Sequence, residues 1–163
     1  MKRKKSGFTL IEMVIVLALT VLVLGITTTV FVTGNKVFVD SDVKTTLQME
    51  AKDIQEKLSS IGMQAIKINS ITGDADSGEI SSIEIVSYNK DGAEEIFKIT
   101  KSELSDYIDS FKIVNKDIIP TVDNPNAYVN ANFIQFAIVL KKDKGYTKSE
   151  QPVNFTVTFR NKS

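Results

Sequence analysis

The feature that most constrains this chain is an uncharged apolar segment near its beginning. From Met13 to Thr33 there is no Asp, Glu, Lys or Arg, and the segment is about twenty residues long. As a helix it would measure roughly 30 Å, which is the thickness of the hydrocarbon core of a bilayer. The sequence therefore predicts a membrane-spanning helix as its first element.

Charged residues flank this segment unequally. Asp40 and Asp42 are among the first charges after it. Four basic residues precede the segment. Because Lys and Arg collect on the cytoplasmic side of membrane helices, we expect the N-terminus inside and the rest of the chain outside. The stretch 26–34 offers no small-x-small cleavage site of the ordinary secretory kind, so a plain signal anchor is one interpretation. The basic residues before the segment are Lys2, Arg3, Lys4 and Lys5.

One acid, Glu12, lies close to the start of the apolar run. A carboxylate deep in a bilayer costs about 2.5–3.5 kcal/mol even on the mild insertion scales, so we expect a compensating interaction. In the simplest case its side chain reaches the cytoplasmic headgroups, as long polar side chains at membrane helix ends do.

The residues around Glu12 carry a more specific pattern. Lys4-Lys5-Ser6-Gly7-Phe8-Thr9-Leu10-Ile11-Glu12 resembles the class III signal of type IV prepilins and of the pseudopilins of type II secretion and competence systems. The resemblance implies that residues 1–7 are a leader and that prepilin peptidase cuts between Gly7 and Phe8. It also implies methylation of the new Phe8 amine, and pairing of Glu12 with the Phe8 amine of a neighbouring subunit in a helical filament.

The same resemblance implies the organisation and the partners of the chain. Segment 8–33 would be the transmembrane and assembly helix, and 34–163 an extracytoplasmic pilin-like domain. The partners would be prepilin peptidase, other pilin subunits, and the cytoplasmic membrane with its assembly platform. The mature subunit would then move from that membrane into an extracellular or periplasmic filament.

Two departures from many major pilins favour a minor pilin or pseudopilin, or a subunit from a cysteine-poor lineage. The apolar segment has no Pro, with Thr29 about where one would be expected, and the chain has no Cys and hence no C-terminal pair. A major pilin, and a membrane-anchored binding domain that does not polymerise, remain alternatives. Cleavage after Gly7 distinguishes the last of these, because a simple anchor keeps its leader.

The composition argues against an enzyme. The absence of Cys and His excludes a disulfide framework, thiol chemistry, a Ser-His-Asp triad and histidine metal ligands. There is no Gly-rich phosphate loop. Without the leader the chain has 16 basic and 20 acidic residues, a net charge of about −4, which is not a nucleic-acid-binding balance, although a filament could still contact DNA. We expect no catalytic residue, cofactor, metal or small-molecule substrate.

Two polar stretches have more than one interpretation. Residues 74–79 begin like a calcium loop, but the twelfth position, where an acid is needed, is Ile85, which favours a plain polar turn. Residues 141–148 are rich in Lys and include Tyr146. They suit the solvated end of a hairpin, or a contact with DNA or a lipid headgroup.

The helical pattern continues after the membrane segment. Apolar residues recur at steps of four and three, which predicts an amphipathic helix. We expect one helix from Phe8 to about Ser60, with Gly34-Asn35 and Gly62 as its weakest points. The apolar stripe comprises Val43, Leu47, Ala51, Ile54, Leu58, Ile61, Ala65 and Ile68.

From about Ile66 onward the pattern changes to alternation, which predicts strands. Residues 80–101 form a hairpin around a turn at 89–92, because Asp91-Gly92 accepts positive φ. Further strands are expected at 111–114, 132–141 and 153–160, with a loop at 123–126. The predicted class is α+β, in which a long N-terminal helix packs on one small antiparallel sheet in the lollipop form of pilins.

Overall fold

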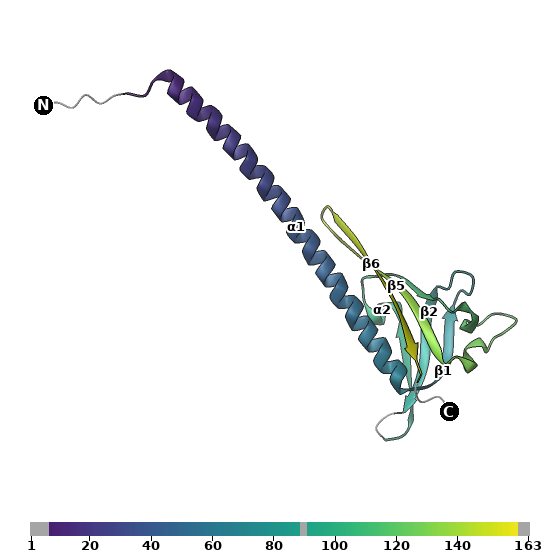
Figure 1. Cartoon of the computed structure of the whole chain (residues 1–163). Helices are drawn as coiled ribbons and strands as arrows, with labels where there is room; N and C mark the ends of the chain where they lie inside the picture. Colours follow the sequence, from purple (N-terminus) through teal and green to yellow (C-terminus); the bar gives the residue numbers. More distant parts are fainter. Residues whose placement is uncertain (1–6, 89–90, 160–163) are drawn as a thin grey trace. The chain divides into compact units, whose positions relative to one another are not determined.

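The computed structural model describes residues 7–88 and 91–159 and has an α+β fold (Figure 1). A long N-terminal helix precedes small antiparallel sheets, as predicted. The chain divides into two structural units, Met1–Ser41 and Asp42–Ser163, and the division falls within the first helix. In chain order the elements are α1 (Leu10–Gln64), β1 (Ala65–Gly73), β2 (Ile80–Tyr88), β3 (Glu94–Thr100), α2 (Lys101–Leu104), β4 (Ile108–Ile113), η1 (Lys116–Ile118), η2 (Ala127–Asn130), β5 (Phe133–Lys144) and β6 (Thr147–Thr158).

Helix α1 is continuous through both glycines that marked its weakest points, Gly34 and Gly62. A glycine inside a helix costs only about 1 kcal/mol relative to alanine, which a helix this long tolerates. The helix ends at Gln64, and β1 begins at the next residue without a loop. Ser87 in β2 donates a 3.0 Å hydrogen bond from Oγ to the carbonyl oxygen of Gln64, which satisfies one backbone group at this helix end.

In the second unit the apolar stripe of α1 is buried as expected, with a solvated face opposite. Its last two expected members, Ala65 and Ile68, are an exception, because they are buried from strand β1 and not from the helix. Ala51 and Ile61 are only half-buried. The fully buried helical side chains are those of Val43, Leu47, Ile54 and Leu58.

The strands form two sheets and not the single sheet that the sequence suggested. Both are three-stranded and antiparallel, with the orders β1-β2-β3 and β4-β5-β6. A single isolated bridge, Glu79 with Lys112, connects the two among the described residues. Alternation along a strand shows which side chains face the core, but not which strands are hydrogen-bonded neighbours, and so it could not show this division.

Individual strands differ from expectation mainly at their ends. The hairpin at 80–101 is confirmed as β2 and β3, with φ of +78° at Gly92 in its turn, while the turn residues Asn89 and Lys90 lie outside the described residues. Strand β4 begins earlier than expected and excludes Val114, and β5 and β6 extend further toward each other. Strand β1 had no counterpart in the expected boundaries.

The core of the second sheet contains a row of three aromatic rings. Phe136 in β5 lies 5.7 Å from Phe111 in β4 and 5.4 Å from Phe155 in β6, measured between ring centroids. Phe136 and Phe155 are direct cross-strand partners, so their rings share one face. The inward face expected for the last strand is buried at Val157 and Phe159 and half-buried at its earlier residues.

Candidate functional site

The start of α1 is closed by a reciprocal pair of hydrogen bonds between Thr9 and Glu12. The Glu12 backbone N–H donates to Thr9 Oγ1 at 3.3 Å, and the Thr9 backbone N–H donates to Glu12 Oε2 at 2.9 Å. The Thr9 hydroxyl also donates to the same Oε2 at 2.9 Å. This is a capping box, in which a residue before the helix and the third helical residue satisfy each other's backbone groups.

The cap gives Glu12 a local role that our sequence interpretation missed. The signal was present, since Thr-x-x-Glu before an apolar run is the sequence pattern of a capping box. Both hydrogen bonds that Glu12 accepts within the described residues go to Oε2, and neither goes to Oε1. The carboxylate is therefore held by its own helix start while one oxygen is left for a further donor.

Gly7 and Phe8 lie immediately before the cap, outside any helix or strand. The Phe8 side chain is exposed, and among the described residues beyond Phe8 no heavy atom lies within 4 Å of the place where a Cβ on Gly7 would stand. The peptide bond between them is thus in an open part of the chain. The basic leader residues Lys2, Arg3, Lys4 and Lys5 lie outside the described residues.

The apolar side chains from Phe8 to Phe38 are exposed, and α1 is long and apolar enough to cross a membrane. Four of the threonines on this surface form hydrogen bonds within the helix. Their hydroxyls donate to the carbonyl four residues earlier at 2.7–3.0 Å, so each polar group is satisfied within the helix. This removes the need for a partner in an apolar medium. The residues are Thr20, Thr27, Thr28 and Thr29.

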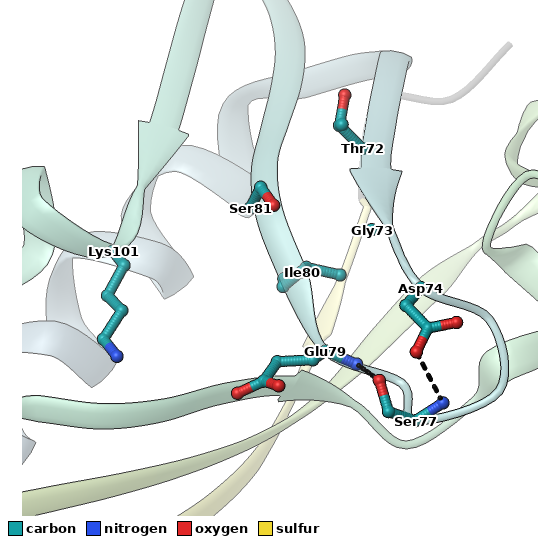
Figure 2. A pocket seen from close by; sticks show the side chains of 8 residues that line it. All are labelled: Thr72, Gly73, Asp74, Ser77, Glu79, Ile80, Ser81 and Lys101. Carbon is teal, nitrogen blue, oxygen red and sulfur yellow. Dashed lines mark hydrogen bonds between the residues drawn. The ribbon is translucent and has the colours of Figure 1, made fainter.

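The polar turn at 74–79 is a joint between the two sheets. Both carboxylate oxygens of Asp74 accept backbone N–H groups. One oxygen accepts from Asp76 at 3.1 Å, and the other accepts from Ser77 at 3.3 Å (Figure 2). Hydrogen bonding to Ser77 and to the Asp76 backbone lowers the pKa of Asp74. Gly78 has a φ of +77°, and its carbonyl accepts a 2.8 Å hydrogen bond from the backbone of Ile113 in β4.

Residues 74–79 at this joint are the stretch that begins like a calcium loop. Among residues 7–88 and 91–159, no three acidic side chains are grouped so that they could hold an ion. The adjacent pocket mixes polar and apolar groups from β1, β2 and α2 (Figure 2). It is lined by Thr72, Gly73, Asp74, Ser77, Glu79, Ile80, Ser81 and Lys101.

The Lys-rich stretch 141–148 forms the end of the β5–β6 hairpin, which agrees with its interpretation as a hairpin end. Lys144 Nζ lies 2.7 Å from Asp42 Oδ2 at the start of the second unit. This hydrogen bond and the positive charge of Lys144 lower the pKa of Asp42.

Comparison with known proteins identifies the N-terminal segment. Residues 2–28 match the family model of the prokaryotic N-terminal methylation motif, a range that contains Gly7, Phe8, the Thr9–Glu12 cap and most of the apolar run. No curated protein and no solved structure matches the chain. The chain therefore begins with a prokaryotic N-terminal methylation motif, the class III signal that is typical of type IV pilins and pseudopilins.

Proposed function

We propose that this protein is a minor pilin or pseudopilin, a structural subunit that prepilin peptidase cleaves between Gly7 and Phe8 and methylates on Phe8. The observation that carries the proposal is the methylation motif at residues 2–28. The motif supports a type IV pilin-like protein that is processed by prepilin peptidase and assembles with other pilin subunits. The missing Pro and Cys favour the minor class.

The geometry at the helix start supports a role for Glu12 in assembly. Cleavage would create a positive amine on Phe8, four residues before Glu12, and methylation leaves that amine charged. A charge buried in an apolar layer is strongly destabilising alone and tolerable when paired. Because Thr9 occupies Oε2, Oε1 is the oxygen that would accept the Phe8 amine of a neighbouring subunit.

The exposed apolar surface of α1 supports the proposed route of the subunit. The apolar side chains from Leu10 to Val32 are all exposed. In the cytoplasmic membrane lipid chains would cover them, and in a filament the equivalent helices of other subunits would do so. We infer that segment 8–33 is the membrane and assembly helix, that the N-terminus stays inside, and that residues 34–163 are exported.

Intact-mass and N-terminal peptide analysis of protein from cells with an active prepilin peptidase tests the processing. We expect the mature chain to begin at Phe8 and to carry a methyl group on its amine. Gly7→Val should abolish the cut, while Ser6→Ala, one residue further into the leader, should leave it intact. Recovery of only uncut wild-type chain would favour a membrane-anchored domain that does not polymerise.

Two variants separate the assembly role of Glu12 from its capping role. Glu12→Ala removes both the cap and the charge, whereas Thr9→Ala removes the threonine side chain of the cap and keeps the charge. We expect Glu12→Ala to be cleaved and inserted normally but to disappear from sheared filaments, and Thr9→Ala to be incorporated. If both variants were lost from the filaments to the same extent, Glu12 would act only as a helix cap. If Glu12→Ala were recovered in filaments as well as wild type, the proposed pairing of Glu12 with the Phe8 amine would be contradicted.

A further inference from the structure

The end of the β5–β6 hairpin is a two-stranded ribbon that extends beyond the second sheet. Strand β4 pairs with β5 only as far as Leu140, whereas β5 and β6 remain paired to Lys144 and Thr147 (Figure 1). Gly145, with a φ of +61°, makes the turn, and Tyr146 beside it is fully exposed. We call residues 141–150 the ribbon tip.

The ribbon tip lies at the end of the second unit where the chain enters it. Lys144 is bonded to Asp42, the first residue of that unit, at 2.7 Å. The opposite end of the unit contains Gln64 and Tyr88, which neighbours Ser87, the partner of the Gln64 carbonyl. Along α1 the 22 residues from Asp42 to Gln64 span about 33 Å. The two exposed tyrosines Tyr146 and Tyr88 thus lie at opposite ends of the second unit.

The ribbon tip has a net positive charge that its ion pairs do not fully neutralise. Residues 141–150 contain four lysines and two acids, a net charge of +2, which the contact of Lys144 with Asp42 reduces to +1. Lys141 pairs with Glu150 at 3.6 Å, and Lys142 lies 4.7 Å from the ring centroid of Tyr107. The side chains in the two ion pairs of the tip are 40–62% exposed. Exposed pairs of this kind are weak, so these ammonium groups remain available to an external phosphate.

The chain itself keeps this end of the unit near the bilayer. Eight residues lie between Thr33, the end of the uncharged segment, and Asp42, so nine residue steps connect the two. They measure about 14 Å as helix and at most about 32 Å when fully extended. Since the headgroup layer adds several ångströms beyond the hydrocarbon, a tip bonded to Asp42 lies within reach of lipid phosphates.

We propose that the ribbon tip binds anionic phospholipid headgroups on the outer face of the membrane, through its lysines and Tyr146. Tyrosine suits this layer because its ring is apolar and its hydroxyl is polar. Each lysine near an anionic surface favours the bound state by about five-fold, equivalent to about 1 kcal/mol. The inference rests on the membrane anchoring proposed above, and it gives the subunit a second contact with the membrane besides α1.

The chain contains no Trp, so a single introduced indole reports its own position. Three full-length variants suffice, each reconstituted in phosphatidylcholine vesicles with and without phosphatidylglycerol. Tyr146→Trp reports the tip, Tyr88→Trp is the matched control at the other end, and Val23→Trp reports insertion of the apolar helix. Quenching is measured with phosphatidylcholine brominated either near the glycerol or near the chain ends.

We expect the indole of Val23→Trp to be quenched by deep bromines in both kinds of vesicle. The indole of Tyr146→Trp should be quenched by shallow bromines in the anionic vesicles, with a blue-shifted emission, and much less in neutral vesicles or at high salt. The indole of Tyr88→Trp should be quenched in neither. Lys148→Glu in the Tyr146→Trp background should weaken the quenching by more than the five-fold expected for one lysine, because it also adds a negative charge.

Four results would overturn the inference. Equal quenching in Tyr146→Trp and Tyr88→Trp, with the Val23→Trp indole inserted, would remove the tip contact and leave the proposed function intact. Equal quenching of Tyr146→Trp in neutral and anionic vesicles would remove the role of the phosphates. Failure of the Val23→Trp indole to insert would remove the membrane anchoring and this inference with it. Protection of the Tyr146→Trp indole from aqueous iodide by duplex DNA, without lipid quenching, would assign the tip to nucleic acid.

Discussion

Helix α1 contains two regions that differ in the exposure of their apolar side chains. In the first unit Leu17 is 63% exposed, and its neighbours on every side of the helix are exposed as well. In the second unit Leu47 is 1% exposed, and polar residues occupy the opposite face. Leucine side chains of one continuous helix are therefore packed in the core in the second region and exposed in the first.

The difference shows where each region obtains its stability. The second region completes a core with the two sheets, so its apolar stripe stabilises the fold of the chain that carries it. The first region is apolar all round, and such a helix is stable only when something outside its own unit covers it. The second region thus stabilises the fold, and the proposed function assigns the first region to insertion and assembly.

The strongest test places the same substitution in each region. Leu47→Asp buries an unpaired charge in the core and should lower the free energy of unfolding by at least about 4 kcal/mol, most of what a small domain has. Leu17→Asp should change it by no more than about 0.5 kcal/mol. Urea unfolding of the detergent-solubilised chain, followed by circular dichroism of the sheets, measures both.

The reverse ranking should hold for membrane insertion. Leu17→Asp should make insertion less favourable by about 3 kcal/mol, whereas Leu47→Asp should leave it unchanged. A glycosylation-based insertion assay reports this directly. If Leu17→Asp unfolded the sheets, or if Leu47→Asp blocked insertion, the two regions would not be independent.

A smaller effect is expected at two of the three glycines of α1. A Cβ on Gly62 would overlap Val157 Cγ1 in β6, so Gly62→Ala should destabilise the second unit by about 1–3 kcal/mol. A Cβ on Gly34 meets no atom within 4 Å, so Gly34→Ala should be neutral or should stabilise the helix by up to about 1 kcal/mol. Thermal unfolding of the two variants gives the comparison.

Combining Gly62→Ala with Val157→Ala checks the proposed cause. The smaller side chain at 157 makes room for the new methyl group, so the double variant should be more stable than the sum of the single effects predicts. Strict additivity would mean that the close approach of α1 and β6 is not the origin of the loss.

The smallest expected effect is the acid dependence of the ribbon tip. The pKa of Asp42 is lowered by the hydrogen bond and charge of Lys144, so this contact is fully present above the usual Asp value of 3.8 and is lost as the pH falls through the lowered value. The protection factors of the amides near Gly145, which correct for the intrinsic exchange rate at each pH, should therefore fall only in acid, with little change in the rest of the unit.

Asp42→Asn is the matched variant for this effect. Its exchange near Gly145 should already be fast at neutral pH and should show no acid step. An acid step that persists in Asp42→Asn would assign the titration to another carboxylate.

Much of this fold could be predicted from local periodicity. Steps of four and three placed Val43, Leu47, Ile54 and Leu58 on the buried face of α1, and all four are buried. Alternation in β5 and β6 predicted their inward faces, because a pleated strand repeats every two residues. The methylation motif could be recognised because its residues are contiguous, and the family comparison confirms it.

Strand β1 shows why the rest could not be predicted. Its buried residues Ala65, Ile68 and Ile71 are spaced by three, because irregularities in its pairing with β2 interrupt the alternation. A spacing of three resembles a helix, which is why the first two were counted with the helical stripe. The role of Gly62 depends on Val157, a residue far away in the chain, and no local pattern reports such a contact.

The direct junction between Gln64 and Ala65 has a mechanical consequence. A tension applied to α1 from its N-terminal side enters the second unit at Asp42, where the contact with Lys144 resists it first. It then meets Val43, Leu47, Ile54 and Leu58 in succession, and finally Gly62 against β6. If α1 is peeled from the sheets, these contacts break one after another. The closest approach of helix and sheet, between Gly62 and Val157, is the last to be loaded.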